Sequence, residues 1–287
     1  MDRRGSSRQG DFTILKYRSC SNTILSIANT FMAGMRATVG HLRDYSIVEL
    51  RRYAIKSGER NNFAEYFQSY FPEAFQQLSV IVFGTFFERR KPERFTWIRG
   101  FHDHFHRGSA NSAFYYGPVW REHRARMNDR IEDSDNVIQL TPVDPSRPIP
   151  VLPAVDPVTD KPQTRGTVVA VIFPVKADEV TRPLESFGPL FAEYRAAGFV
   201  EVSVLQTIDA PNTFPQLPIR SDGPFVVWLG IAPSSIESES RAPFVFETGS
   251  TEDPILAKLR GQPEVIVLDP TPRSRLRWLP EFFGPMA

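Results

Sequence analysis

Apolar and polar residues alternate over residues 45–56, Y-S-I-V-E-L-R-R-Y-A-I-K, with the period of a β-strand. One face of this strand is apolar: Val48, Leu50 and Ala54. The other face carries a carboxylate, a guanidinium and a phenol beside Ile47: Glu49, Arg51 and Tyr53. We expect the apolar face to lie under a helix layer, because the remaining apolar pattern predicts helices nearby. The polar face would then be the sheet face that needs a second cover.

The pattern after this strand predicts a complete small unit over residues 45–143. Aromatic residues at helical spacing predict a helix over 59–77, with a kink or break at Pro72. Strands are expected over 79–88, 95–101 and 137–141, and a helical stretch from 103 resumes at 119–132 with Pro118 as its first residue. Strand, helix, strand, strand, helix, strand is the order of a ferredoxin-like unit, whose helices cover one sheet face only.

The same order of elements returns over residues 166–275. Strands are expected over 166–175, 200–207, 225–232 and 264–268, with helices over 177–197 and 254–260. F-T-W-I-R-G-F and F-V-V-W-L-G-I occupy matching third-strand positions, so Trp97 and Trp228 are equivalent. The sequence therefore predicts an α+β fold of two tandem ferredoxin-like domains, whose sheets close on each other into a barrel.

Two segments lie outside these units. Residues 1–44 are rich in Arg and Ser and predict a disordered or weakly helical tail, with a mitochondrial transit peptide as the alternative to a cytoplasmic protein. Residues 144–165 are rich in Pro and predict an extended linker, with a proline-rich recognition motif as its alternative.

Composition narrows the functional classes. The 287 residues are 41% apolar and 23% charged, with a net charge of +1, which gives no electrostatic reason to bind nucleic acid or an anionic membrane. One cysteine, Cys20, excludes an internal disulfide, and no apolar run is long enough for a membrane span. The sequence lacks nucleotide-binding and serine-hydrolase motifs such as G-x-G-x-x-G and G-x-S-x-G. Its 23 Phe indicate aromatic cores or an apolar cavity.

Several motifs resemble those of the NIPSNAP family. They are Y-S-I-V-E-L-R-R-Y-A-I-K-S-G at 45–58, F-T-W-I-R-G-F at 95–101, F-Y-Y-G-P-V-W-R-E-H-R at 114–124, D-S-D-N-V-I-Q-L at 133–140, A-P-N-T-F-P-Q-L-P-I-R at 210–220 and P-E-V-I-V-L-D-P-T-P-R-S at 263–274. The resemblance implies dimeric α/β-barrel domains of the two-domain bacterial type. It supplies no agreed catalytic residues.

Three functions follow as hypotheses. The first is a small organic ligand in the barrel cavity, with a cofactor-independent monooxygenase or an isomerase as the enzyme. The second is a non-catalytic adaptor with a filled barrel and no pocket, and the third is a haem-binding barrel. No other cofactor is expected. The repeat removes the usual reason to dimerise, although exposed sheet edges leave a homodimer open.

The main candidate site combines the polar face of the first strand with the third strand. Glu49 is the candidate acid or base, and Arg51 and Arg99 would hold an anion, because guanidinium grips a carboxylate or enolate. Tyr53 and Trp97 would contact the ligand. The alternative is a structural Glu–Arg pair between the two sheets.

Other candidates are less specific. Tyr115, Tyr116, Trp120 and His123 could contact a ligand, and His123 could be a proton shuttle or a haem ligand. Asn212 and Arg220 would line the second barrel mouth, with a loop held by Phe214 and Leu217 packing as the alternative. Trp228 would be the ligand contact equivalent to Trp97. The pair at helical spacing, His102 and His106, is a weak metal candidate. Spacing fixes no third ligand, although Asp103 or His123 could reach, and exposed helix residues are the alternative.

Overall fold

Residues 45–155, 166–232 and 255–283 are described by the structure, a computed structural model. The strands in these residues are β1 (Ile47–Ile55), β2 (Ile81–Glu88), β3 (Arg94–Phe101), β4 (Ile131–Asp133), β5 (Val137–Pro142), β6 (Thr167–Pro174), β7 (Val200–Thr207), β8 (Phe225–Ala232) and β9 (Glu264–Pro270). The predicted tail and residues 156–165 of the predicted linker lie outside the described residues.

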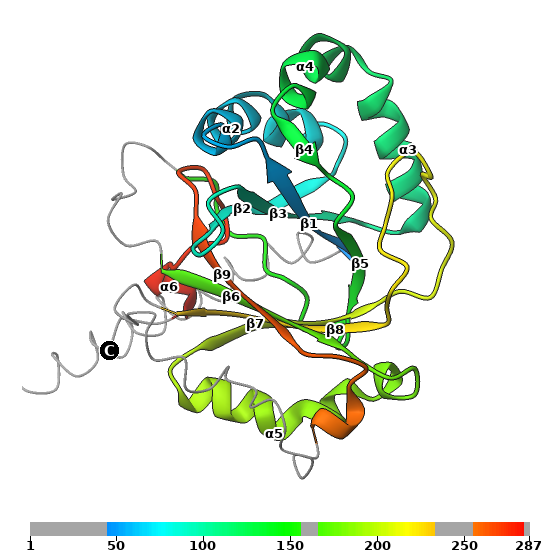
Figure 1. Cartoon of the computed structure of the whole chain (residues 1–287), viewed down its shortest axis with the longest axis vertical. Helices are drawn as coiled ribbons and strands as arrows, with labels where there is room; N and C mark the ends of the chain where they lie inside the picture. The colour runs from blue at the N-terminus through cyan, green and yellow to red at the C-terminus, as the bar shows by residue number, and fades with distance from the viewer. Residues whose placement is uncertain (1–44, 156–165, 233–254, 284–287) are drawn as a thin grey trace, which may run out of the picture. The chain divides into compact units, whose positions relative to one another are not determined.

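The strands form one closed antiparallel barrel (Figure 1). The hydrogen-bonded order is β3-β2-β9-β6-β8-β7-β5-β1, and β1 pairs with β3 to complete the ring. The short β4 pairs with the end of β1 outside this ring. A ring satisfies the backbone groups that an open sheet would leave unpaired at its two edges.

The two halves of the ring have the same strand order. It is β5-β1-β3-β2 in the first half and β9-β6-β8-β7 in the second, which in each half reads fourth, first, third, second. The halves join through β2–β9 and β5–β7 pairing. The predicted ferredoxin-like halves and their closure into a barrel are confirmed, while the tandem duplication and the domain boundaries at 143 and 166 stay predictions.

Helices cover the outside of the ring (Figure 1). The first half carries α2 (Arg60–Gln76), α3 (His104–Tyr115) and α4 (Pro118–Asn128), and the second carries α5 (Pro183–Ala196). Short helices complete the described chain: η2 (Glu179–Thr181), η4 (Leu256–Lys258) and α6 (Pro280–Phe283). No helix in the described ranges is long and apolar enough to cross a membrane.

Helix α2 runs through Pro72 as one element, so of the expected kink or break the break into two pieces is wrong. Proline cannot donate to the carbonyl four residues earlier, which here belongs to Gln68. The Arg273 guanidinium donates to that carbonyl instead, and the Gln68 side chain accepts from the Arg273 backbone N–H at 2.8 Å. A distant segment thus supplies the partner that the helix loses.

The barrel interior is an apolar core built by both halves. Its residues are buried side chains from strands of each half, among them Val48, Leu50, Ile138, Leu140, Val168, Ala170 and Ile266. Two further apolar clusters lie between the ring and its helices, one under α2 and α3 and one under α5. The barrel is therefore filled by side chains along its inner face.

The expected orientation of the first strand is wrong. Val48 and Leu50 point into the barrel interior, whereas Tyr53 belongs to the cluster under α2 and Glu49 contacts a residue of α3. The strand β1 is buried on both faces, so both needed a cover and alternation alone did not say which cover each face receives. The face of Val48 and Leu50, which also carries the ion-paired Arg52, lies inside the ring, and the face of Glu49, Arg51 and Tyr53 lies under the helices.

Smaller differences concern element ends. Pro118 begins α4 as predicted, but the helix stops at Asn128 and the following residues form β4. The expected helix over 177–197 is split into η2 and α5, and α5 contains Pro189. The described part of the expected helix over 254–260 is a single 3-10 turn, η4.

Truncation of the barrel interior tests this core. Leu140 is fully buried inside the ring, whereas Leu184 on α5 is 47% exposed. We expect Leu140→Ala to lower the free energy of unfolding by about 2–5 kcal/mol, because it removes buried methyl groups and leaves a cavity. The matched control, Leu184→Ala, should change it by about 0.5 kcal/mol or less. Urea unfolding measures both; equal effects would contradict the assigned core.

Candidate functional site

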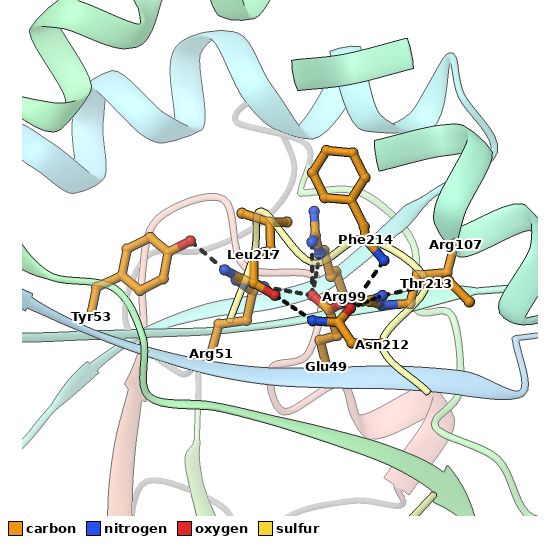
Figure 2. A network of polar contacts seen from close by, with 9 residues as sticks. All are labelled: Glu49, Arg51, Tyr53, Arg99, Arg107, Asn212, Thr213, Phe214 and Leu217. Carbon is orange, nitrogen blue, oxygen red and sulfur yellow. Dashed lines mark hydrogen bonds and ion pairs between the residues drawn. The ribbon is translucent and has the colours of Figure 1, made fainter. Parts of the chain in front are cut away.

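The site is built on the helix-facing side of β1 and β3. Antiparallel register sets Glu49 beside Arg99 and Arg51 beside Trp97. These side chains point the same way because residues two apart in a strand share a face. The site's other side comes from α3. Its N-cap is Asp103, whose side chain accepts the His106 backbone N–H at 2.7 Å. This capped start directs Arg107 toward the sheet (Figure 2).

One carboxylate holds three guanidiniums (Figure 2). Glu49 Oε2 accepts from Arg51 Nη1 and from Arg99 Nε, both at 2.8 Å, and Oε1 accepts from Arg107 Nε at 2.6 Å. The Glu49 and Arg99 side chains are fully buried, and Arg51 is 1% exposed. Arg51 Nε also donates to the Tyr53 hydroxyl at 3.1 Å. The arrangement fixes Arg51 and Arg99 in place on the sheet.

The charges set the protonation states of this cluster. Burial alone raises the pKa of Glu49, but Arg99, Arg51 and Arg107 outweigh it and hold that pKa well below its usual range. Burial, opposed by Glu49, lowers the pKa of Arg107, and the neighbouring guanidiniums add to the decrease. Burial also raises the pKa of the Tyr115 phenol, which therefore stays protonated at neutral pH. Glu49 is ionised and fully engaged.

The loop between β7 and β8, residues 208–224, covers the site from the second half of the chain (Figure 2). Arg107 Nη1 donates to Asn212 Oδ1 at 2.9 Å and to Thr213 Oγ1 at 3.1 Å. Phe214 stacks on Tyr115 with ring centroids 5.8 Å apart. Asn212 also donates to the Leu217 carbonyl and accepts the Phe214 N–H, so it shapes the loop itself. Asn212 thus serves the first-half site, not the second-half mouth that we expected.

A cavity of about 390 Å³ lies between the sheet and the helices of the first half. That volume suits a small organic molecule. Most of its wall is aromatic: Tyr53, Phe67, Phe71, Phe75, Trp97, Phe114, Tyr115, Tyr116, Trp120 and Phe214. Arg51 lines the floor of the cavity on the sheet side. The lining also includes Arg124 of α4, which is exposed to solvent, and Gln216 and Leu217 of the β7–β8 loop. The described lining contains no Asp, Glu, His, Cys or Lys.

The cluster beside the cavity carries excess positive charge. Glu49 supplies one negative charge against the three positive charges of Arg51, Arg99 and Arg107. Arg99 Nη1 and Arg107 Nη2 are buried without a hydrogen-bond partner among the described residues. Buried donors without partners cost free energy, so such groups usually mark a place for water or a ligand.

The second half has no such cluster at the matching positions. With Trp228 matched to Trp97, strand register matches Glu49 to Val169, Arg51 to Val171 and Arg99 to Gly230. The Trp228 ring lies over Gly230, where any Cβ would come within 2.0 Å of it, and packs on Tyr194 at 4.8 Å. Apolar packing therefore fills the place that the arginines take in the first half, and Trp228 lies outside the cavity lining.

The histidine candidates are used elsewhere. His106 accepts the His102 backbone N–H at 3.2 Å through Nδ1, and its Nε2 is 2.9 Å from the Leu78 carbonyl, so both ring nitrogens have backbone partners. No group of metal-binding side chains occurs in the part of the chain that the structure describes, so the metal candidate is not supported. His123 Nδ1 is 2.7 Å from the Tyr66 hydroxyl, and its ring stacks on Tyr70 rather than lining the cavity.

The structure thus unites most of the predicted site. Glu49, Arg51 and Arg99 form one ion-pair cluster, while Tyr53, Trp97, Tyr116 and Trp120 line the cavity beside it. Sequence reasoning named Tyr115 as a candidate, missed Arg107 and Thr213, and did not single out Phe214 for the site. The spacing of Arg107, Asn111 and Phe114 on one helix face could have indicated that α3 points a guanidinium inward.

Comparisons with known proteins give only distant similarities. No family model and no curated protein matches the chain. Solved structures with a similar fold include an anthrone oxidase-like protein, which is 12% identical, with a TM-score of 0.48 over 79% of this chain and 92% of that one. A proposed monooxygenase from Lactobacillus acidophilus is also 12% identical, with a TM-score of 0.47 over 79% and 94%.

A NIPSNAP family protein from Agrobacterium tumefaciens is 20% identical, with a TM-score of 0.33 over 36% of this chain and 92% of that one. This similarity covers about a third of the chain, so the resemblance to the NIPSNAP family stays a prediction for the whole. At these identities and TM-scores the comparisons carry no argument about ligand or reaction.

Neutralising Glu49 should strongly destabilise the protein. Glu49→Gln keeps the shape of the side chain but leaves three buried guanidiniums without a counter-charge. We expect the free energy of unfolding to fall by about 3–5 kcal/mol at pH 7. Urea unfolding measures it, with Glu185→Gln as the control, because Glu185 is exposed and pairs with Arg182 at 3.8 Å. A loss in Glu49→Gln no larger than in the control would contradict the cluster's role.

The difference in unfolding free energy between wild type and Glu49→Gln should depend on pH in a defined way. The folded-state pKa of Glu49 lies below its unfolded value of about 4.3, so its stabilisation is complete above roughly pH 5. That stabilisation is lost as pH falls further, through the lowered folded-state pKa. The difference in unfolding free energy between wild type and Glu49→Gln should therefore be constant from about pH 5.5 to 8 and shrink below about pH 4. A difference that grows on acidification would contradict this assignment.

Proposed function

We propose that this protein binds a small, planar organic molecule in the cavity of its first half. The observation that carries this proposal is the 390 Å³ cavity walled by aromatic side chains with one arginine at its floor. Aromatic walls bury large apolar area and favour flat rings through offset or edge-on contacts. A few polar groups at one end would fix the orientation of the bound molecule.

The charged cluster supports this function as a rigid floor. Arg51 touches both the cavity and Glu49, so its guanidinium is held before any ligand arrives. Pre-ordering of this kind reduces the entropy that binding must otherwise lose. We therefore propose Glu49 as a positioning residue, because it does not line the cavity and its carboxylate already accepts from three guanidiniums.

Binding is favoured over proton-transfer catalysis, the enzyme hypothesis of a monooxygenase or isomerase. A general base must reach the proton that it removes. The described cavity lining offers only phenols and guanidiniums as titratable groups, and burial keeps the Tyr115 phenol protonated. Arg51 could stabilise an enolate only for a substrate that loses its proton without a carboxylate or imidazole base, because the described lining supplies neither.

The haem hypothesis fits these residues poorly. Its expected axial ligand, His123, is hydrogen-bonded to Tyr66 and does not line the cavity, whose described lining includes no His or Cys. The adaptor hypothesis predicted a filled barrel without a pocket. The barrel interior is filled, but the cavity outside it gives the molecule a place for a ligand.

Blocking the cavity tests the proposal. The probes are naphthalene-2-carboxylate and naphthalene-2-carboxamide, two flat molecules of the same shape, measured by isothermal titration calorimetry. We expect at least one to bind, and Leu217→Trp to weaken it by more than about tenfold, because the larger ring fills the cavity from the β7–β8 loop. Leu184→Trp on α5 is the control and should leave binding unchanged. Binding of neither probe would refute the proposal.

A further inference from the structure

The cavity has one polar end, formed by an arginine and two phenols. Arg51 donates through Nη1 to Glu49 and through Nε to Tyr53, and its Nη2 makes no hydrogen bond to the described residues. The Tyr53 hydroxyl accepts from Arg51, so its own proton is free to be donated. The Tyr115 phenol lines the same cavity, interacts electrostatically with Arg51 and Tyr53, and makes no hydrogen bond to the described residues either. Three donors therefore remain at this end of the cavity.

None of these three donors is hydrogen-bonded to an acceptor of the described lining. The single carboxylate of the cluster, Glu49, does not line the cavity and already accepts from three guanidiniums. Arg99 and Arg107 lie behind Arg51 and add two positive charges that Glu49 cannot balance. An anion at the polar end would gain both the hydrogen bonds and the field of the unbalanced guanidiniums.

We infer that the ligand of this cavity is a planar aromatic carboxylate, whose two oxygens accept from Arg51, Tyr53 and Tyr115 while its rings pack against the aromatic walls. This inference rests on the proposed function and names its ligand class. A carboxylate is ionised at neutral pH and offers two acceptor oxygens in the plane of the ring. A neutral molecule of the same shape would leave the buried positive charge unanswered.

The burial of the two arginines in the lining predicts which of them determines the preference for an anionic over a neutral ligand. Arg51 is buried at the floor, whereas the cavity's other arginine, Arg124, is exposed to solvent. Solvent screens an exposed charge far more than a buried one. Arg51 should therefore determine the preference for the anion, and Arg124 should contribute little.

The two naphthalene probes have the same shape but differ in charge, and the carboxamide has one acceptor oxygen where the carboxylate has two; they test this inference by calorimetry at pH 7. Wild type should bind the carboxylate about 10- to 100-fold more tightly than the carboxamide, since hydrogen bonds to a charged group are the stronger ones. In Arg51→Met that ratio should fall toward one, with carboxamide affinity changed by less than about threefold. Arg124→Met is the matched control and should keep the wild-type ratio.

A second variant avoids any dependence on how well Arg51→Met folds. Tyr115→Phe removes one donor without changing charge, and should weaken the carboxylate by about 3- to 10-fold and the carboxamide, whose oxygen is the weaker acceptor, by less. Equal binding of the two probes by wild type would overturn the inference while the proposed function stands. Binding of neither probe would overturn both.

Discussion

The first half of this molecule depends on one buried carboxylate. Glu49 holds guanidiniums that arrive from its own strand, from β3 and from α3, and so ties the sheet to its helix layer. Removal of a charge from water is costly, and only close pairing offsets that cost. The cluster also orients the arginine that faces the cavity. The stability of the first half and the ligand recognition that we propose are therefore coupled through a single side chain.

Much of the architecture follows from pattern alone. Alternation, aromatic spacing and the repeated strand order are local signals, and they predicted two ferredoxin-like halves in one barrel. These signals could not predict which face of the first strand lies inside the barrel, because β1 is buried on both faces. Val48 and Leu50 could have packed under helices or inside the ring with similar hydrophobic gain. Only the partners on other elements decided between these covers.

The candidate site was predictable to a similar depth. Glu49, Arg51, Tyr53, Trp97 and Arg99 share one strand face or neighbouring strands, so spacing in the sequence brings them together. Arg107, Thr213 and Phe214 reach the site through tertiary packing, and no short-range pattern reports that. His102 and His106 show the opposite error, since helical spacing suggested a metal pair whereas backbone groups use the His106 ring.

The covalent link between the two halves does more than close the barrel, because the β7–β8 loop of the second half covers the site of the first half. This loop contributes Asn212, Thr213 and Phe214 to a site whose floor belongs to the other half. In a site shared by two separate chains, loss of the partner on dilution would remove such a cover. Here the cover is tethered, so its effective concentration is set by the chain and does not change with the amount of protein. The affinity for a ligand should thus be independent of the protein concentration.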